Sequence, residues 1–225
     1  MLFFKEGLIH VDPGPGAFVY LKGLGIDAID IDLVVLSHIH LDHSADINSI
    51  IEAATDGGRI IKTALFAPKS AFEGDNRVVL PFIRKRLAKE GYLSEGVSLS
   101  FNGLSVQAVM SHSHHGTETY ALFFQNRVLY VSCGMFEERM LELYPKNPEV
   151  MLINTTLLVK KPYIQHLCVD DAKILISSLK PKRAFLTHFG DELLSLTNPD
   201  EIASSLSDEL GIEVLAARDS MEVLL

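Results

Sequence analysis

The chain has 225 residues, 48% of them hydrophobic, and its 20 basic and 29 acidic side chains give a net charge of −9. This length and apolar content allow one sizeable core, and we expect a single domain over residues 1–225. The acidic balance disfavours binding to a phosphate backbone, so a large nucleic acid is not the expected partner. One basic cluster, Arg84-Lys85-Arg86, is either a solvated helix face or a site that steers an anionic substrate.

Apolar, β-branched runs alternate with amphipathic stretches along the chain. This pattern fits two sheets with helices on their outer faces, an α/β fold. The strands are predicted at residues 8–11, 31–37, 60–66, 106–110, 120–124, 128–132, 151–154 and 184–187. The helices are predicted at residues 45–54, 81–90, 136–144, 169–179 and 200–210.

The run His38-Ile39-His40-Leu41-Asp42-His43 places three imidazoles and a carboxylate between a predicted strand and a predicted helix. Imidazole and carboxylate are ligands that suit zinc, iron and manganese. His38 and His40, two apart in extended chain, can point the same way and bind one ion. Asp42 and His43 lie past the turn and can bind a second. The run predicts a metal site.

This run resembles the H-x-H-x-D-H signature of the metallo-β-lactamase superfamily. Three further segments match that family in order: Asp12-Pro13-Gly14-Pro15-Gly16, Tyr130-Val131-Ser132-Cys133 and Thr187-His188-Phe189-Gly190. The resemblance covers most of the chain. It implies a four-layer αβ/βα sandwich of two mixed sheets with outer helices, and a late metal ligand at His188.

The third histidine ligand is ambiguous, because Ser111-His112-Ser113-His114-His115 offers three candidates. In phosphodiesterase-like members of the family this ligand lies six residues before a small residue of the next strand. Counting back from Ala121 selects His115, with His112 as the main rival. The unassigned histidines could orient the ligands through hydrogen bonds.

Cys133 stands where the family usually has an aspartate that bridges two metal ions. One subclass of the β-lactamases has a cysteine at this place, which binds the second zinc together with an aspartate and a histidine. By that similarity the second site is Asp42, Cys133 and His188, and the softer thiolate favours zinc. The alternatives are a weak second site or a buried packing cysteine.

His166 precedes the predicted helix at residues 169–179. RNA-processing members of the family have a histidine at the comparable point, which is thought to contact the scissile phosphate or to protonate the leaving group. The resemblance therefore implies that His166 binds substrate and acts as a general acid. A helix neighbour without a chemical role is the alternative.

Location and assembly follow from weaker signals. No apolar run reaches the roughly 18 residues of a membrane span, and the N-terminus lacks the order of a signal peptide. Two cysteines outside a CxxC pair do not form a disulfide framework, so we expect a cytoplasmic protein without membrane partners. Relatives carry an extra strand pair before the loop at Asp12; either it is missing here or another subunit covers that edge, as in a homo-oligomer.

These features predict a metal-dependent hydrolase that uses a metal-bound hydroxide. The expected cofactor is one or two zinc ions, or else iron or manganese. Asp42 is expected to accept the proton of the water. The third motif is nearer the phosphodiesterase and tRNA-processing branch, so the expected substrate is a small anionic or phosphodiester-type molecule. Two alternatives remain: hydrolysis of a lactam, lactone or thioester, and a non-enzymatic or regulatory metal protein with an impaired second site.

Overall fold

The computed structural model describes residues 1–224, which divide into two compact units. Unit 1 comprises residues 1–108 and 117–120, and unit 2 comprises residues 109–116 and those from 121 onward. Two strands, β7 (Leu104–Ser111) and β8 (Tyr120–Phe124), contribute residues to both units. Each unit has its own hydrophobic core, so each is described separately.

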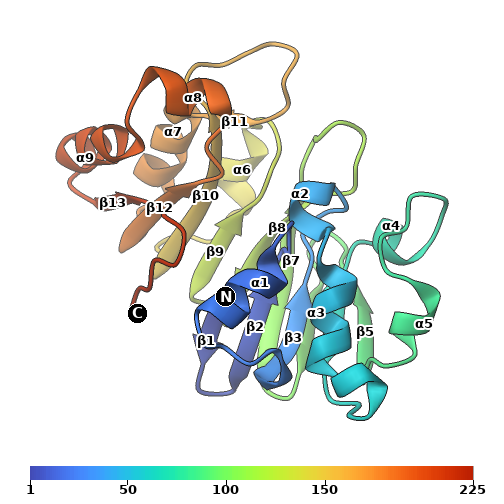
Figure 1. Ribbon diagram of the computed structural model, residues 1–225. Helices are drawn as coiled ribbons and strands as arrows, with labels where there is room; N and C mark the ends of the chain where they lie inside the picture. The colour runs from blue at the N-terminus through green and yellow to red at the C-terminus, as the bar shows by residue number, and fades with distance from the viewer. Residues whose placement is uncertain (225) are drawn as a thin grey trace. The chain divides into compact units, whose positions relative to one another are not determined.

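Unit 1 is built on a five-stranded mixed sheet (Figure 1). Its first two strands pair antiparallel, and the later pairs are parallel. The strands in spatial order are β1 (Leu2–Phe4), β2 (Gly7–Val11), β3 (Ile31–Val35), β4 (Ala64–Ala67) and β5 (Lys89–Tyr92). A hairpin of β6 (Ser98–Phe101) and the first residues of β7 also belongs to this unit, and its leucine side chains pack against glycines of the sheet.

Helices cover one face of this sheet. Leu21 of α1, Ile50 of α3 and Ile83 of α5 join Leu8 and Val34 of the strands in one buried cluster. The helical segments are α1 (Ala17–Gly23), η1 (Ala28–Asp30), α2 (Leu41–Ser44), α3 (Ile47–Ala54), η2 (Asp56–Gly58), α4 (Lys69–Phe72) and α5 (Pro81–Arg84). The strand β3 therefore runs through the core, and the residues that follow it lie at the carboxyl end of the sheet.

Unit 2 contains a second mixed sheet, in the order β13-β12-β10-β9-β8, with β11 beside β10. Only β8 and β9 pair antiparallel within this set. Its strands after β8 are β9 (Val128–Val131), β10 (Val150–Leu157), β11 (Leu167–Cys168), β12 (Arg183–Thr187) and β13 (Glu213–Ala216). Its helices are α6 (Arg139–Leu143), α7 (Val169–Leu179), α8 (Asp191–Leu196) and α9 (Pro199–Leu210).

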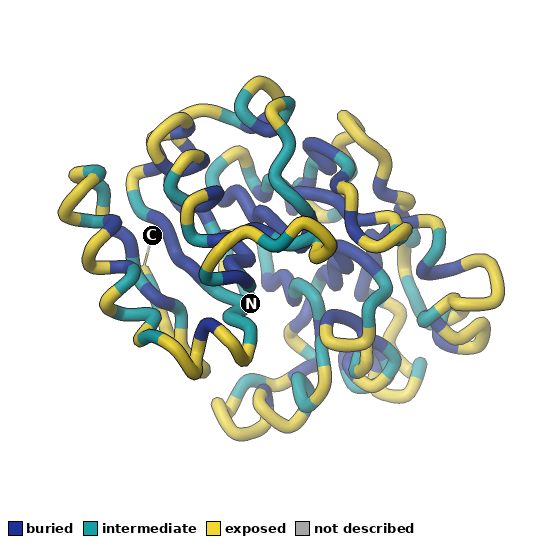
Figure 2. Tube along the Cα trace, turned by 90° about the horizontal axis from the view of Figure 1, so that it is seen from above, coloured by how far each residue is buried: buried dark blue, intermediate teal, exposed yellow. Residues whose placement is uncertain are grey.

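The apolar faces of α6, α7 and α9 pack on this sheet in one cluster that includes Met140, Leu175 and Leu206. Figure 2 shows that the buried stretches of the chain follow the strands, while exposed stretches follow the loops and outer helix turns. Within residues 1–224, no helix has the length and apolar character needed to cross a membrane.

The elements predicted from sequence are largely confirmed, and α7 and β8 have the predicted bounds. The helix predicted at residues 81–90 is wrong: α5 ends at Arg84, and Lys89–Tyr92 forms the strand β5, paired parallel to β4. A Cβ on Gly91 would lie 2.5 Å from Phe66 Cδ1, so the strand can lie here because this position is glycine. Pairing with β4 thus overrides the local helical pattern.

Candidate metal centre

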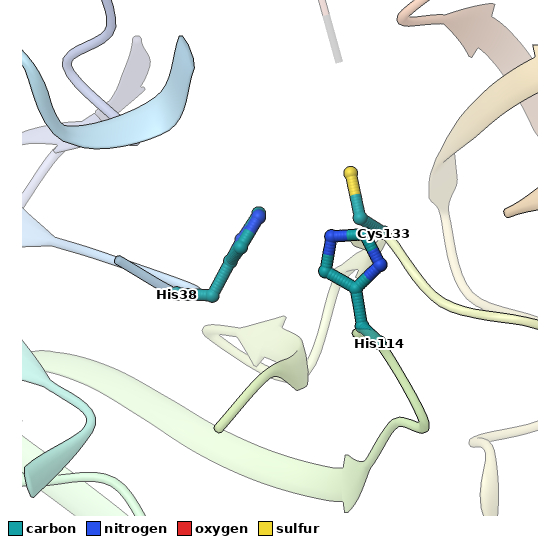
Figure 3. A group of neighbouring side chains, drawn as sticks. All are labelled: His38, His114 and Cys133. Carbon is teal, nitrogen blue, oxygen red and sulfur yellow. The ribbon is translucent and has the colours of Figure 1, made fainter. Parts of the chain in front are cut away.

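In unit 1, the histidine-rich run lies where β3 ends and α2 begins. His38 follows β3, His40 directly precedes α2, and Asp42 and His43 lie in its single turn (Figure 3 shows His38). The ring centroids of His38 and His43 are 4.1 Å apart, and those of His38 and His40 are 4.8 Å apart. The strand end and the short helix therefore bring all three imidazoles of the motif together.

Asp12, in the loop after β2, anchors this group. Its carboxylate accepts hydrogen bonds from Ser37 N at 2.6 Å and from Ser37 Oγ at 2.7 Å, and His43 Nδ1 lies 2.9 Å from Oδ2. Burial alone would raise the pKa of Asp12, but the hydrogen bond from His43, the interactions with His43 and His38, and the Ser37 N–H hold that pKa below its ordinary value. Asp12 is therefore a buried anion that orients the motif.

The acceptor character of Asp12 fixes the imidazole tautomers. A carboxylate only accepts, so His43 carries its proton on Nδ1. The Ser37 hydroxyl donates to Asp12, so His38 Nδ1, 2.9 Å from Ser37 Oγ, must be the donor of that contact. In the neutral form of both rings Nε2 then carries the lone pair, as a metal-ligating histidine requires.

The donor atoms of the motif are arranged as cation ligands. His43 Nε2 lies 3.4 Å from Asp42 Oδ2, so in the neutral ring its lone pair and the carboxylate lie side by side. Ligand atoms of Asp12, His38 and His43 lie within 4.8 Å of one another. His40 Nε2 lies 3.1 Å from Thr117 Oγ1. The residues of unit 1 thus fit a divalent metal ion by the chemistry and spacing of their donors.

In unit 2, candidate ligands follow the ends of parallel strands. Cys133 comes two residues after β9, and His188 directly follows β12; both strands pair with β10. Cys133 Sγ lies 3.6 Å from His188 Nε2, and Asn154 Nδ2 of β10 donates to the same sulfur at 3.2 Å. Because the carboxyl ends of parallel strands meet at one edge, this clustering follows from the topology.

Among the three histidines after β7, His114 lies beside the cysteine. Figure 3 shows His114 and Cys133 of unit 2, whose ligand atoms are within 4.8 Å of one another. His114 is buried, and its Nδ1 donates to the Gln165 carbonyl at 3.0 Å, which leaves the lone pair on Nε2. His115, selected by residue counting, is exposed, and its ligand atom is grouped with those of His114 and His166.

His112, the other rival, is committed to the protein interior. Its Nδ1 lies 2.9 Å from the Cys133 carbonyl, and its Nε2 contacts the hydroxyl of Tyr144. The carbonyl only accepts, so the order of donation is Tyr144 O–H to Nε2 and Nδ1–H to Cys133 O. Burial lowers the pKa of His112, consistent with a neutral ring. His112 therefore holds the turn that carries Cys133, rather than a metal ion.

Gly134 completes this turn. Its φ of 152° lies in a region that favours glycine, and an added Cβ would lie 2.6 Å from His112 Cβ. The backbone after Cys133 can approach the imidazole this closely only without a side chain at position 134.

His166 and His188 share one hydroxyl. Thr156 Oγ1 lies 3.1 Å from His166 Nδ1 and 2.9 Å from His188 Nδ1. The two rings stack with centroids 5.8 Å apart and an interplanar angle of 22°. His166 also lies against His114, with ring centroids 4.8 Å apart. The structure thus places His166 within the histidine cluster of unit 2.

The basic cluster Arg84-Lys85-Arg86 lies outside both ligand sets. Arg84 donates to both carboxylate oxygens of Glu90, at 2.9 and 2.6 Å, and lies over the ring of Phe72. Arg86 pairs with Glu52. Two of its three side chains are therefore held in ion pairs within unit 1.

Several supporting residues were not singled out from the sequence. The sequence pattern predicts only a loop at Asp12, and it predicts no role for Asn154, Thr156, Gln165 or Tyr144. One signal was available: Asn154-Thr155-Thr156 interrupts the apolar run of a strand, and Asn154 is 2% exposed. Polar side chains inside a buried strand require partners, and here the partners are a sulfur and two imidazoles.

Comparison with known proteins agrees with this fold. Residues 8–189 match the family described as beta-lactamase superfamily domain. An uncharacterized protein of Methanocaldococcus jannaschii is 30% identical over 230 residues, which cover 97% of this chain and 84% of that protein. The chain therefore belongs to the beta-lactamase superfamily, and the sequence resemblance is confirmed.

Solved structures show the same fold. The metallo-β-lactamase fold protein YhfI from Bacillus subtilis is 18% identical, with a TM-score of 0.80, over 97% of this chain and 88% of that one. A diphosphatase from the PhnP family is 17% identical, with a TM-score of 0.75, over 99% of this chain and 82% of that one. The predicted fold class is thereby confirmed, whereas the single domain stays a prediction.

The environment of Cys133 leads to a first prediction. If its thiolate binds metal, an alkylating reagent should modify Cys133 slowly in the zinc-loaded protein and at least about tenfold faster after chelation, because coordination removes the nucleophilic lone pair. Peptide mass spectrometry after timed labelling measures both cysteines at once. Cys168 is the internal control: it is as buried as Cys133, but its thiol donates to Asp171 Oδ2 and belongs to none of the candidate ligand groups, so its labelling rate should be the same with and without chelator. Identical labelling of Cys133 with and without chelator would contradict the prediction.

Proposed function

We propose that the protein is a zinc-dependent hydrolase of a small anionic or phosphodiester-type substrate. The observation that carries this proposal is the tautomer pattern. His38, His43 and His114 each have Nδ1 tied to an anchored acceptor and the lone pair on Nε2. Such anchoring is the usual support of metal-ligating histidines.

The proposed ligands form two sets, one in each unit. The resemblance implies a dinuclear enzyme, and the donor chemistry of each set suits a metal ion. The ligand role of His115 passes to His114, because His114 is the buried ring beside Cys133. The thiolate of Cys133 is the reason for proposing zinc over iron or manganese. The proposed ligands are His38, His40, Asp42 and His43 in unit 1, and His114, Cys133 and His188 in unit 2.

A bound zinc ion supplies a nucleophile at neutral pH, since it lowers the pKa of a water ligand from 15.7 to about 7. Asp42 would hold the ion and act as the proton acceptor, as the resemblance implies; its carboxylate lies in the turn of α2 next to the imidazole of His43. His166 binds the substrate and donates a proton to the leaving group.

The shared hydroxyl of Thr156 prepares His166 for that role. When His188 uses Nε2 as a ligand, its Nδ1–H donates to Thr156 Oγ1. The Thr156 hydroxyl has one proton, which it then donates to His166 Nδ1. The resting, neutral His166 ring then carries its own proton on Nε2. To act as a general acid the ring takes up a second proton on Nδ1, and the Thr156 hydroxyl turns to accept from it. Transfer of the Nε2 proton to the leaving group then leaves a neutral ring. Thr156 is therefore a positioning residue that sets the tautomer of the general acid.

The assignment of His114 is tested by zinc titration of two adjacent alanine variants. His114→Ala should weaken zinc binding by more than about 100-fold, the upper end for changes outside the ligands, whereas His115→Ala should weaken it by less than about tenfold. Competition with a chromophoric chelator gives both constants. Equal losses, or the reverse order, would return the ligand role to His115.

The reaction class is tested with the zinc-loaded protein and a panel of chromogenic substrates: a phosphodiester, a lactam, a lactone and a thioester. We expect the phosphodiester to be hydrolysed fastest. His188→Ala should abolish this hydrolysis and should also lower the amount of zinc bound to the protein. Faster turnover of the lactam, lactone or thioester would favour the alternative hydrolases. A fully zinc-loaded protein that hydrolyses none of them would favour a regulatory metal protein.

The role of Thr156 is tested by a matched pair of substitutions. Thr156→Val keeps the shape but removes the hydroxyl, and at saturating zinc it should lower kcat by about 100-fold, the lower end of the contribution of a general acid. Thr156→Ser keeps the hydroxyl and should stay near the wild-type rate. Imidazole ¹⁵N shifts provide an independent readout, since the Nε2–H tautomer of His166 should predominate in wild type and Thr156→Ser but not in Thr156→Val. An unchanged tautomer in Thr156→Val would refute the role.

A further inference from the structure

A pocket of about 340 Å³ lies within unit 2, beside the histidine cluster. Its walls come from the loop between β10 and β11, the start of the segment after Cys133, and the His115-Gly116 turn. This volume is at the lower end of the range for small-molecule sites. A larger pocket of about 490 Å³ lies between α9 and β13, but its lining contains neither histidine nor cysteine.

The lining of the smaller pocket is basic in a chain with a net charge of −9. Lys160, Lys161, His115 and His166 contribute to it, and no carboxylate is among its lining residues within the described part of the chain. Lys161 pairs with Glu192 of α8, which neutralises its charge. Lys160 has no ion-pair partner among residues 1–224, so it supplies the positive charge of this pocket.

The same pocket has an apolar side. Met135, Phe136 and Ile164 line it, and Tyr163 adds a side chain that is 92% exposed. An exposed aromatic side chain beside a basic one is suited to a ligand that is apolar or aromatic at one end and anionic at the other. A bare inorganic anion would leave the apolar side uncovered, and an uncharged aromatic ligand would leave Lys160 without a partner.

We propose that this pocket binds the organic leaving group and the anionic group of a small aromatic phosphate ester, with Lys160 as the residue that selects for negative charge. The inference rests on the proposed function, because it assigns the substrate class of the same site. His166 links the two: it lines the pocket, and its Nδ1 is held by Thr156 within the ligand cluster. A substrate seated here therefore places its leaving group next to the proposed general acid.

The test uses phenylphosphonate, whose phosphorus–carbon bond is not hydrolysed, and the full-length protein freed of metal, so that binding cannot arise from coordination to zinc. Isothermal titration should show phenylphosphonate binding to the wild type about tenfold more tightly than methylphosphonate, which lacks the ring. Lys160→Gln should bind phenylphosphonate about tenfold more weakly than the wild type. Lys173→Gln, with the same change of charge on α7 outside the pocket, should match the wild type.

Equal affinity of the wild type and Lys160→Gln, equal affinity for the two phosphonates, or no binding at all would each overturn the proposal. Failure of the proposed function is distinguishable, because the substrate panel measures it in the zinc-loaded protein. Phosphonate binding that depends on Lys160 in a protein without hydrolase activity would retain the pocket and reject the reaction. If Lys160→Gln leaves phosphodiester hydrolysis unchanged and the protein binds no phosphonate, the proposed reaction is retained and the pocket proposal is rejected.

Discussion

The hydrogen bond to Nδ1 is the constraint on which both ligand sets depend. An isolated imidazole can present either nitrogen to a metal ion and can rotate about its side-chain bonds. Here His38 is held by Ser37, His43 by Asp12, His114 by the Gln165 carbonyl and His188 by Thr156. Each hydrogen bond selects one tautomer of the ring and restricts the rotation of the ring about its side-chain bonds. The entropy of ordering the rings is thus lost on folding, rather than on metal binding.

Fixing the imidazole rings requires a few polar groups to be buried, and their loss of hydration disfavours folding. Asp12 shows how the fold offsets this free energy: burial disfavours its charge, yet the hydrogen bond from His43, the interactions with His43 and His38, and the Ser37 N–H keep its pKa low. A charged group buried without such partners would be strongly destabilising. Gly14 permits the close approach of this loop to α2, since an added Cβ would lie 2.0 Å from the Asp42 carbonyl oxygen. The Asp12 loop and the metal-binding motif are therefore one structural element.

Much of the fold and part of the site could be predicted from sequence, for identifiable reasons. The motif at His38–His43 is local, and the pattern of β3 placed it correctly at a strand end. The choice among His112, His114 and His115 was not local: it depends on Tyr144 and Gln165, 32 and 51 positions from their partners. Counting back from Ala121 uses only the spacing of the family motif and cannot show which ring is buried; His115 has a φ of 46° and is exposed, whereas His114 is buried. Lys89–Tyr92 was misassigned because its structure depends on pairing with β4.

The sulfur of Cys133 has hydrogen-bonding partners in the fold and is also a candidate metal ligand. The Asn154 amide donates a hydrogen bond to the sulfur of Cys133. In the metal-free state the Cys133 thiol can donate to His188 Nε2. This nitrogen carries the lone pair when His188 Nδ1–H donates to Thr156. A metal ion bound by both atoms must displace that one proton, while the Asn154 contact, which needs only an acceptor, persists and favours the thiolate. An aspartate at position 133 would accept from Asn154 equally well, but it would present harder oxygen atoms. The surroundings of Cys133 thus suit either side chain, and in the proposed second site the identity of this residue would set which metal is preferred.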